Sequence, residues 1–183
     1  MLISTLPNLT RDSEMNLASE VTLRRFSDED LDKVMEINRT CLPENYSAYF
    51  FLEVYKNCPE AFLVATHNGR LVGYIMCRLE SGFSELGHMM LAKKGHVVSI
   101  AVVPDYRRVG IASSLMLSAL SALAAHGASE AFVEVRVTND PAIYLYRKLG
   151  FKIAKRVGRY YYNGEDAFVM SIPIDGTFPE RAA

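Results

Sequence analysis

The sequence predicts a single domain of mixed α/β class, with one sheet flanked by helices, and three observations lead to this prediction. Apolar, β-branched runs alternate along the chain with segments whose apolar residues recur at helical spacing. Their order is two strands, then strand, helix, strand, helix and strand, which is typical of a mixed sheet. The 183 residues are 50% hydrophobic and 22% charged, so the chain is long enough to bury a core and too apolar to be disordered.

The chain is predicted to begin its folded part with a strand and two helices. Val21 to Phe26 alternates like an edge strand. Ser27 and the acidic residues after it favour the start of a helix from about Glu29 to Arg39, which must stop before Pro43. After a loop, an aromatic-rich helix is expected from Ala48 to about Lys56.

A hairpin and a buried strand follow. Ala61 to Thr66 and Arg70 to Leu79 are apolar runs, and the Asn68-Gly69 pair between them favours a tight antiparallel turn. The segment from Glu80 to Gly95 is rich in Gly, Ser and Lys and is predicted to be a loop. His96 to Val103 is nearly continuously apolar, as in a strand that is buried on both faces.

The last part alternates helix and strand. A long helix is predicted from about Val109 to His126, and a β-branched strand from Ala131 to Val137. Asn139 to Gly150 has caps, an early proline and a closing glycine, which predict a short helix of about two turns. Phe151 to Val157 and Asp166 to Ile172 are expected to form a final strand pair.

Composition limits the partners and the compartment. The 20 basic and 21 acidic side chains give a net charge of −1, whereas nucleic acid and anionic membranes select a basic surplus, so neither is an expected partner. The cysteines Cys41, Cys58 and Cys77 lack C-x-x-C spacing, which suggests neither a disulfide framework nor a thiolate zinc site and favours the reducing cytoplasm. We expect residues 1–19 to form a flexible arm, 20–173 a single domain, and 174–183 a tail.

The segment from Val98 to Ser114 contains the clearest chemical signal. It predicts a buried strand, a turn with Arg107, Arg108 and Gly110, and the start of a helix. Free backbone N–H groups and the helix dipole favour an anion at such a helix start, where Gly110 permits close approach. An ordinary surface turn with solvated arginines is the alternative.

Two motifs in this sequence resemble the signatures of the GNAT family of N-acetyltransferases. Arg107-Arg-Val-Gly-Ile-Ala112 matches Q/R-x-x-G-x-G/A, and Asn139-Asp-Pro-Ala-Ile-Tyr-Leu-Tyr146 looks like the second signature. The resemblance implies a mostly antiparallel central sheet and acetyl-CoA as co-substrate, with no metal required. It also implies that the first motif, together with Asn139 and Tyr146, binds the cofactor. The residues of that motif are Arg107, Arg108, Val109, Gly110, Ile111 and Ala112.

Three further segments resemble archaeal N-terminal acetyltransferases similar to the catalytic subunit of the NatA complex. They are 42–46, 95–102 and 159–167. The resemblance implies that Glu44 and Tyr46 shape the pocket for the first residue of the substrate, and that Tyr160 and Tyr161 bind its backbone. Ordinary aromatic packing at a strand edge is the alternative for the tyrosines.

Acetyl transfer needs an uncharged amine, and the family places catalytic groups at two strand positions occupied here by His96 and Glu134. The pKa of an α-amine, about 7.7 to 8.0, is much lower than the roughly 10.4 of a lysine, so a histidine base suits a terminal amine. We therefore expect His96 and Glu134 to be the general base groups, with Glu134 either a second base or a group that orients a water. The alternatives are a solvated strand-end His96 and a surface ion pair between Glu134 and Arg136.

Other groups have supporting roles in this prediction. Tyr146 is expected to donate a proton or hydrogen bond to the departing sulfur, or else simply to pack in the core. The backbone amides of Ile100, Ala101 and Val102 are expected to pair with the pantetheine arm and to supply an oxyanion donor. No sequence signal activates a cysteine, which favours direct transfer over an acetyl-cysteine route.

The sequence thus predicts an acetyl-CoA-dependent N-terminal α-acetyltransferase acting on newly made proteins. The rivals are a lysine acetyltransferase, a ribosomal-protein-specific N-terminal enzyme, and a silent acyl-CoA-binding module that regulates a partner. A monomer or weak dimer is expected, and ribosome association stays open.

Overall fold

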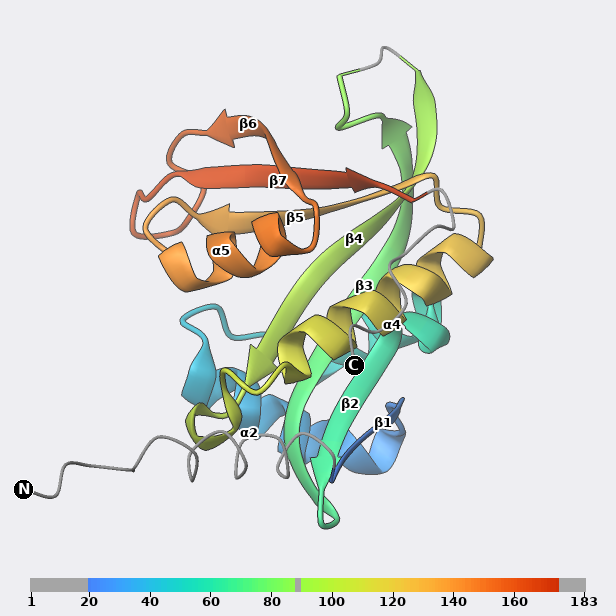
Figure 1. The fold of residues 1–183 in the computed structure, drawn as a ribbon, viewed down its shortest axis with the longest axis vertical. Coiled ribbons are helices and arrows are strands. Elements are labelled where there is room, and N and C mark those ends of the chain that lie inside the picture. Colours follow the sequence, from blue (N-terminus) through green and yellow to red (C-terminus); the bar gives the residue numbers. More distant parts are fainter. Residues whose placement is uncertain (1–19, 88–89, 175–183) are drawn as a thin grey trace, which may run out of the picture.

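The structure is a computed structural model that describes residues 20–87 and 90–174. The expected arm, 1–19, and almost all of the expected tail lie outside the described residues. Seven strands form one sheet in the order β1-β2-β3-β4-β5-β7-β6 (Figure 1). They are β1 Val21–Arg25, β2 Phe62–His67, β3 Arg70–Phe83, β4 Leu91–Val102, β5 Glu130–Arg136, β6 Lys152–Val157 and β7 Ala167–Pro173.

The pairing of the strands confirms the predicted mixed sheet. β4 and β5 pair in parallel, and every other neighbouring pair in the described chain is antiparallel. The Asn68-Gly69 turn joins β2 to β3 as predicted, with positive φ at both residues.

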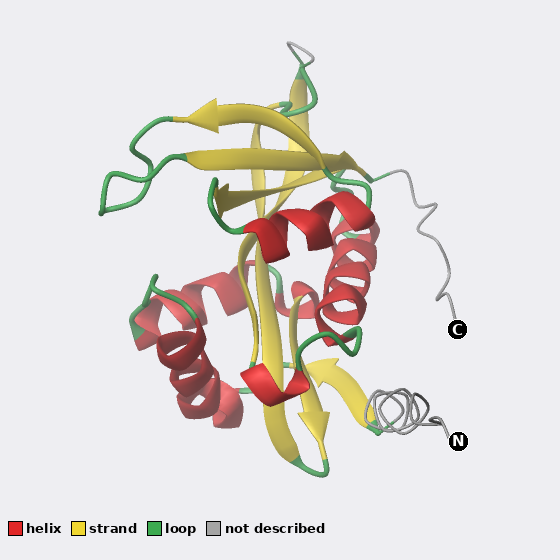
Figure 2. Ribbon diagram, turned by 60° about the vertical axis from the view of Figure 1, so that its left-hand side comes forward, coloured by secondary structure: helices red, strands yellow, loops and turns green. Residues whose placement is uncertain are grey.

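Helices cover both faces of the sheet (Figure 2). They are α2 Leu31–Cys41, α3 Ala48–Asn57, α4 Ile111–Ala125 and α5 Asp140–Lys148, with short 3₁₀ turns η1 Asp28–Asp30, η2 Pro59–Ala61 and η3 Pro104–Tyr106. The apolar sides of α2 and α3 pack on Phe62, Val64 and Tyr74, whereas α4 and α5 pack on the opposite face with Ile75 and Val97. Alternation along the strands therefore divides the core into two clusters.

The prediction of a loop from Glu80 to Gly95 is wrong at both ends of that segment, because β3 continues to Phe83 and β4 begins at Leu91. Cross-strand pairs run from Glu80↔Lys94 to Phe83↔Leu91. Its glycines and charges belong to a long hairpin rather than to a loop. Buried Glu130 holds the turn of this hairpin, since its carboxylate accepts from the Ser84 hydroxyl at 2.5 Å and the Glu85 backbone N–H at 2.7 Å.

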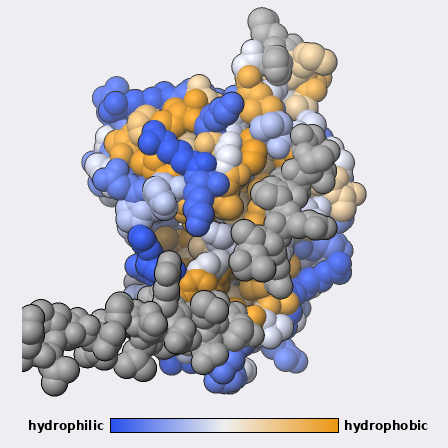
Figure 3. All heavy atoms as spheres, in the orientation of Figure 1, coloured by the Kyte–Doolittle hydropathy of each residue, from blue (hydrophilic) through white to orange (hydrophobic). Residues whose placement is uncertain are grey.

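The tip of this hairpin projects from the molecule (Figure 1). Phe83, Met90 and Leu91 are exposed there, and Figure 3 shows hydrophobic residues beside the grey segment at the tip. In the described residues no helix is both long and apolar enough to span a bilayer.

Candidate active site

The sheet opens between its two central strands. β4 pairs with β5 only from Lys94 to His96, opposite Glu130 to Phe132, and the strands then diverge (Figure 1). Beyond His96, β4 pairs with β3 alone. Ile100, Ala101 and Val102 lie on this one-sided part, so the edge expected to pair with an extended ligand is present.

His96 lies where the two strands separate, between two carboxylates. Its Nε2 is 2.8 Å from Glu134 on β5, and its Nδ1 is 2.9 Å from Glu80 on β3. The imidazole stacks on Phe132 with ring centroids 4.4 Å apart. The His96 side chain is only 12% exposed, so the alternative of a solvated strand-end histidine is wrong.

Alternation explains why these side chains meet. Val133 and Val135 belong to the core beneath α4 and α5, so Glu134 must point to the other face of the sheet. Glu80 also bonds Arg78 Nε at 2.6 Å. Burial tends to raise the pKa of Glu80, but the bonds and charges of His96 and Arg78 outweigh it and hold that pKa below its ordinary value.

The alternative ion pair between Glu134 and Arg136 is also wrong. Arg136 instead bonds Glu44, in the loop after α2, and Glu165 at 2.6 Å. Its guanidinium lies 3.9 Å from the ring centroid of Tyr161. One arginine on β5 thus connects the two segments that are expected to wall the peptide slot.

The first of these walls is fixed by Asn38, a buried residue of α2. Its amide donates to the Glu44 carbonyl at 3.1 Å and to the Tyr74 hydroxyl at 3.0 Å, and accepts from the Tyr46 N–H at 3.4 Å. The Tyr74 hydroxyl in turn lies 2.7 Å from the Ser99 hydroxyl. This buried network determines where Glu44 and Tyr46 lie.

The three predicted substrate tyrosines lie close enough to Glu44 or Glu134 for these carboxylates to affect their pKa values. Burial and then the Glu134 carboxylate raise the pKa of Tyr160 to about 12. Burial and then the Glu44 carboxylate raise the pKa of Tyr46 and of Tyr161. These hydroxyls therefore stay protonated at neutral pH and are available as hydrogen-bond donors.

The predicted anion loop has the expected backbone. Gly110 is the residue before α4, with φ of +91°, and a Cβ there would meet no atom within 4 Å. Glycine has no side chain to cap the first N–H groups of α4, so they are available to an anion. Arg107 and Arg108 are exposed, and Arg107 Nε donates to the Val102 carbonyl at 2.8 Å.

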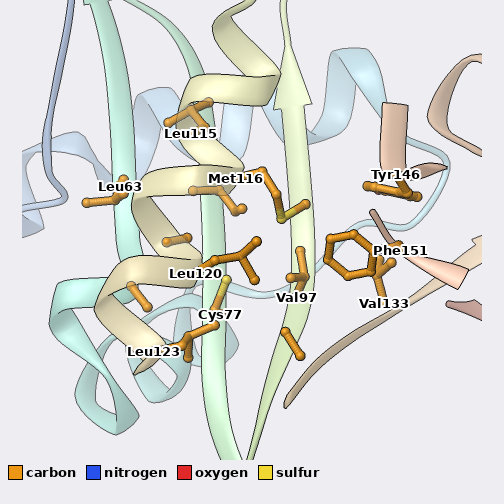
Figure 4. Close-up of a cluster of buried hydrophobic side chains, with 14 of the residues drawn as sticks. Leu63, Cys77, Val97, Leu115, Met116, Leu120, Leu123, Val133, Tyr146 and Phe151 are labelled. Atoms are coloured by element: carbon orange, nitrogen blue, oxygen red, sulfur yellow. The ribbon is translucent and has the colours of Figure 1, made fainter. Parts of the chain in front are cut away.

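The second predicted cofactor segment is α5. The side chain of Asn139 caps this helix by accepting from Ala142 N–H at 3.3 Å. Tyr146 is 4% exposed and packs beside Phe151 and Val133 (Figure 4). Burial raises the pKa of Tyr146, so its hydroxyl stays neutral. Both Asn139 and Tyr146 thus have structural contacts, and their roles toward a ligand stay predictions.

Glu80, Arg136 and Asn38 were missed as site residues. The composition around Glu80 predicts a loop, and only the longer β3 strand seen in the structure places it beside His96. Arg136 was considered only as a partner for Glu134. Asn38 interrupts the apolar face of α2, and a polar residue at such a position indicates a buried hydrogen-bonding role.

Comparison with known proteins gives one consistent result. The family model described as "Acetyltransferase (GNAT) family" matches residues 31–151. The N-alpha-acetyltransferase of Sulfurisphaera tokodaii is 48% identical over 164 residues, covering 88% of this chain and 98% of that protein.

Two solved structures are also similar. Ard1 from Thermoplasma volcanium has a TM-score of 0.74 and 31% identity, covering 85% of this chain and 98% of that one. Arabidopsis thaliana Naa50, in complex with the bisubstrate analogue CoA-Ac-MVNAL, has a TM-score of 0.73 and 28% identity, covering 84% and 98%. These similarities confirm the predicted family and fold.

Proposed function

This chain belongs to the acetyltransferase (GNAT) family, and from that premise we propose that it transfers acetyl from acetyl-CoA to the free α-amino group of protein N-termini. One observation carries the proposal. The His96–Glu134 pair joins β4 to β5 where the sheet opens, with the loop before α4 at the end of β4 and the Glu44 and Tyr161 walls on the His96 side.

The cofactor-binding elements fit the group that the family uses. The first turn of α4 offers uncapped N–H groups beside Gly110, and the free edge of β4 offers a partner for an extended chain. Acetyl-CoA supplies the acetyl group as a thioester. We assign Arg107 to Ala112, Asn139 and Tyr146 to its binding.

The residues at the opening act on the proton and on the charge of the reacting atoms. His96 and Glu134 accept the proton of the incoming amine, because a protonated amine has no lone pair for attack. A backbone N–H among Ile100, Ala101 and Val102 stabilises the developing oxyanion. The Tyr146 hydroxyl, kept protonated by burial, donates to the departing sulfur.

The substrate enters on the face that carries the tyrosines. Glu44 and Tyr46 border the first residue, and Tyr160 and Tyr161 donate to its backbone. An extended peptide end fits this slot between two walls. The three cysteines are free within the described residues, which fits the reducing cytoplasm, where we propose that the enzyme acts on newly made proteins. Arg136 connects the walls within one chain, which supports a monomer that needs no second copy to complete the slot.

The test measures acetyl transfer to peptides that differ only in residue one, beside N-terminally blocked peptides containing lysine. We expect activity on free N-termini, reduced about 10²-fold to 10⁴-fold in Glu134→Ala and strongly in His96→Ala. Tyr160→Phe tests the tyrosine that is assigned to the substrate backbone. Tyr162→Phe, which alters an exposed residue of the same loop, is its control.

Three results would contradict the proposal. Activity confined to blocked lysine peptides would favour a lysine acetyltransferase. Activity only on the N-terminus of one ribosomal protein would favour the specialised enzyme. Binding of acetyl-CoA without turnover on any peptide would favour the silent regulatory module.

A further inference from the structure

Three potential metal ligands from distant parts of the sequence meet outside the active site. Cys58 and Glu60 lie in and beside η2, between α3 and β2, and His126 directly follows α4. η2 and α4 are in contact, and one ligand atom from each of the three residues lies within 4.8 Å of the other two. None of these residues has a role in the proposed acetyl transfer.

The hydrogen bonds of His126 prepare one ring nitrogen as a ligand. Nδ1 lies 2.9 Å from the Ala122 carbonyl, which can only accept, so Nδ1 carries a proton. Nε2, which lies beside Glu60, then keeps a lone pair that can bind a metal ion. A histidine that ligates a metal nearly always donates its other N–H to such a carbonyl or carboxylate.

The distance between His126 and Glu60 fits a metal ion bound between them better than a direct hydrogen bond. Nε2 is 3.3 Å from Glu60 Oε2, and no hydrogen bond joins these two atoms within the described chain. A charge-assisted hydrogen bond would be about 2.7 to 2.9 Å long. Two ligand atoms at about 2.0 to 2.1 Å from a tetrahedral zinc ion are roughly 3.3 Å apart.

The remaining contacts leave the ligand atoms available. Arg25 approaches the other oxygen of Glu60, Oε1, at 3.4 Å and leaves Oε2 toward His126. Cys58 is 1% exposed, and burial raises the pKa of its thiol against the effect of a hydrogen bond from the backbone N–H of Ala61, a bond that a metal-bound thiolate can also accept. A divalent ion displaces the thiol proton, and its two charges are then balanced by one thiolate and one carboxylate, with His126 neutral.

We propose that Cys58, Glu60 and His126 bind one zinc ion, with water as the fourth ligand. Thiolate and imidazole select zinc over magnesium or calcium. Binding replaces the S–H bond of Cys58 by an S–Zn bond and releases one proton to solvent. The ion joins the segment before β2 to the end of α4 and takes no part in acetyl transfer.

The experiment uses the full chain, freed of metal by a chelator and kept reduced without added thiols. It is titrated with Co²⁺, whose visible and thiolate charge-transfer bands report tetrahedral sulfur ligation, and then with Zn²⁺. We expect one Co²⁺ per chain, one proton released, displacement by Zn²⁺, and a higher melting temperature with Zn²⁺.

Matched variants separate the site from other thiols. Cys58→Ala should abolish the charge-transfer band, whereas Cys41→Ala, which alters a cysteine outside the cluster, should retain it. His126→Asn changes a half-exposed residue, so the variant should fold, and its zinc affinity should fall at least about tenfold. No charge-transfer band in the wild-type chain, a band that persists in Cys58→Ala, or an affinity unchanged in His126→Asn would overturn the site and leave an ion pair between His126 and Glu60.

Discussion

His96 Nε2 and the Glu134 carboxylate are 2.8 Å apart, and they join β4 to β5 where the backbones of these strands stop pairing. The other ring nitrogen faces Glu80 at 2.9 Å. A neutral imidazole has one N–H, so it donates to one of these carboxylates, and its other nitrogen can accept a proton. In the proposed mechanism Nδ1 donates to Glu80, so Nε2 and Glu134 accept the proton of the amine, and Glu80 is a positioning residue that holds His96.

Changing Glu80 to Gln should therefore affect the chemical step more than peptide binding. A glutamine amide is neutral and can donate to Nδ1, which favours the tautomer that carries its proton on Nε2. We expect kcat to fall about tenfold or more with peptide KM nearly constant. Steady-state kinetics across pH would test this, with exposed Glu53→Gln as the control. An unchanged kcat and pH profile would show that Glu80 has no such role.

Replacing Arg136 by Ala should loosen both walls of the slot. The guanidinium bonds Glu44 and Glu165 and stacks on Tyr161, so its loss frees two loops at once. A hydrogen bond to a charged group contributes about 1.5 to 3 kcal/mol, which corresponds to a peptide KM raised about tenfold or more. The KM for acetyl-CoA should not change. Arg156→Ala, which removes an exposed arginine paired with Asp166, should leave both values near wild type.

Replacing Asn38 by Ala should disturb the Glu44 wall from beneath. The Glu44 carbonyl and the Tyr46 N–H lose their buried partner, at a cost of about 1 to 3 kcal/mol in the free energy of unfolding. Urea denaturation measures this cost. Activity on a panel of peptides that differ in residue one should show that the variant discriminates less among them than wild type does. Tyr74→Phe removes only the hydroxyl and should disturb the preference less. If wild type and Asn38→Ala discriminate equally among first residues, this network does not determine substrate specificity.

The sequence was informative where a local pattern determines the structure. The Asn68-Gly69 turn, the glycine before α4 and the Asn139 cap each depend on a few neighbouring residues, and all three are found. His96 and Glu134 were both expected to act in catalysis, and they meet because alternation puts their side chains on the same face of neighbouring strands.

Longer-range features were not visible in the sequence. Glu80 contacts His96 only because the β3–β4 hairpin extends past the part of the sheet that helices cover, and its charges resembled those of a loop. The contact between Arg136 and Glu44 joins residues 92 positions apart, and no local pattern reports it. Side-chain partners across a sheet depend on the register of several strands at once.

Gly95 should not tolerate a methyl group. A Cβ there would lie 2.5 Å from Cδ1 of Leu123, a fully buried residue of α4. Overpacking of this kind costs about 1 to 3 kcal/mol. Gly82→Ala, in the paired strand, places its Cβ 3.7 Å from the Lys94 side chain and is the matched control. Thermal unfolding should show a large decrease in melting temperature for Gly95→Ala alone. Equal melting temperatures of the two variants would refute the close packing of α4 on β4.

The salt bridge between Arg24 and Asp30 should make part of the stability depend on pH. Arg24 bonds both oxygens of Asp30 at 2.6 and 2.7 Å, and the N–H and hydroxyl of Ser27 bond the same carboxylate. The hydrogen bond of Arg24 is the main cause that holds the pKa of Asp30 below its ordinary value of 3.8, against the effect of burial.

Because the folded-state pKa is the lower one, this contribution is fully present above the unfolded value and is lost as the pH falls through the folded value. Asp30→Asn should therefore be less stable than wild type by about 1 kcal/mol at pH 6, because the neutral amide loses the charge that pairs with Arg24 and one of the two oxygens that Arg24 binds. The difference should shrink as the pH falls below 3.8. Asp28→Asn, which alters an exposed acid of the same turn, is the control. Urea denaturation at several pH values measures both differences, and a gap between wild type and Asp30→Asn that stays constant with pH would contradict the assigned role of this carboxylate.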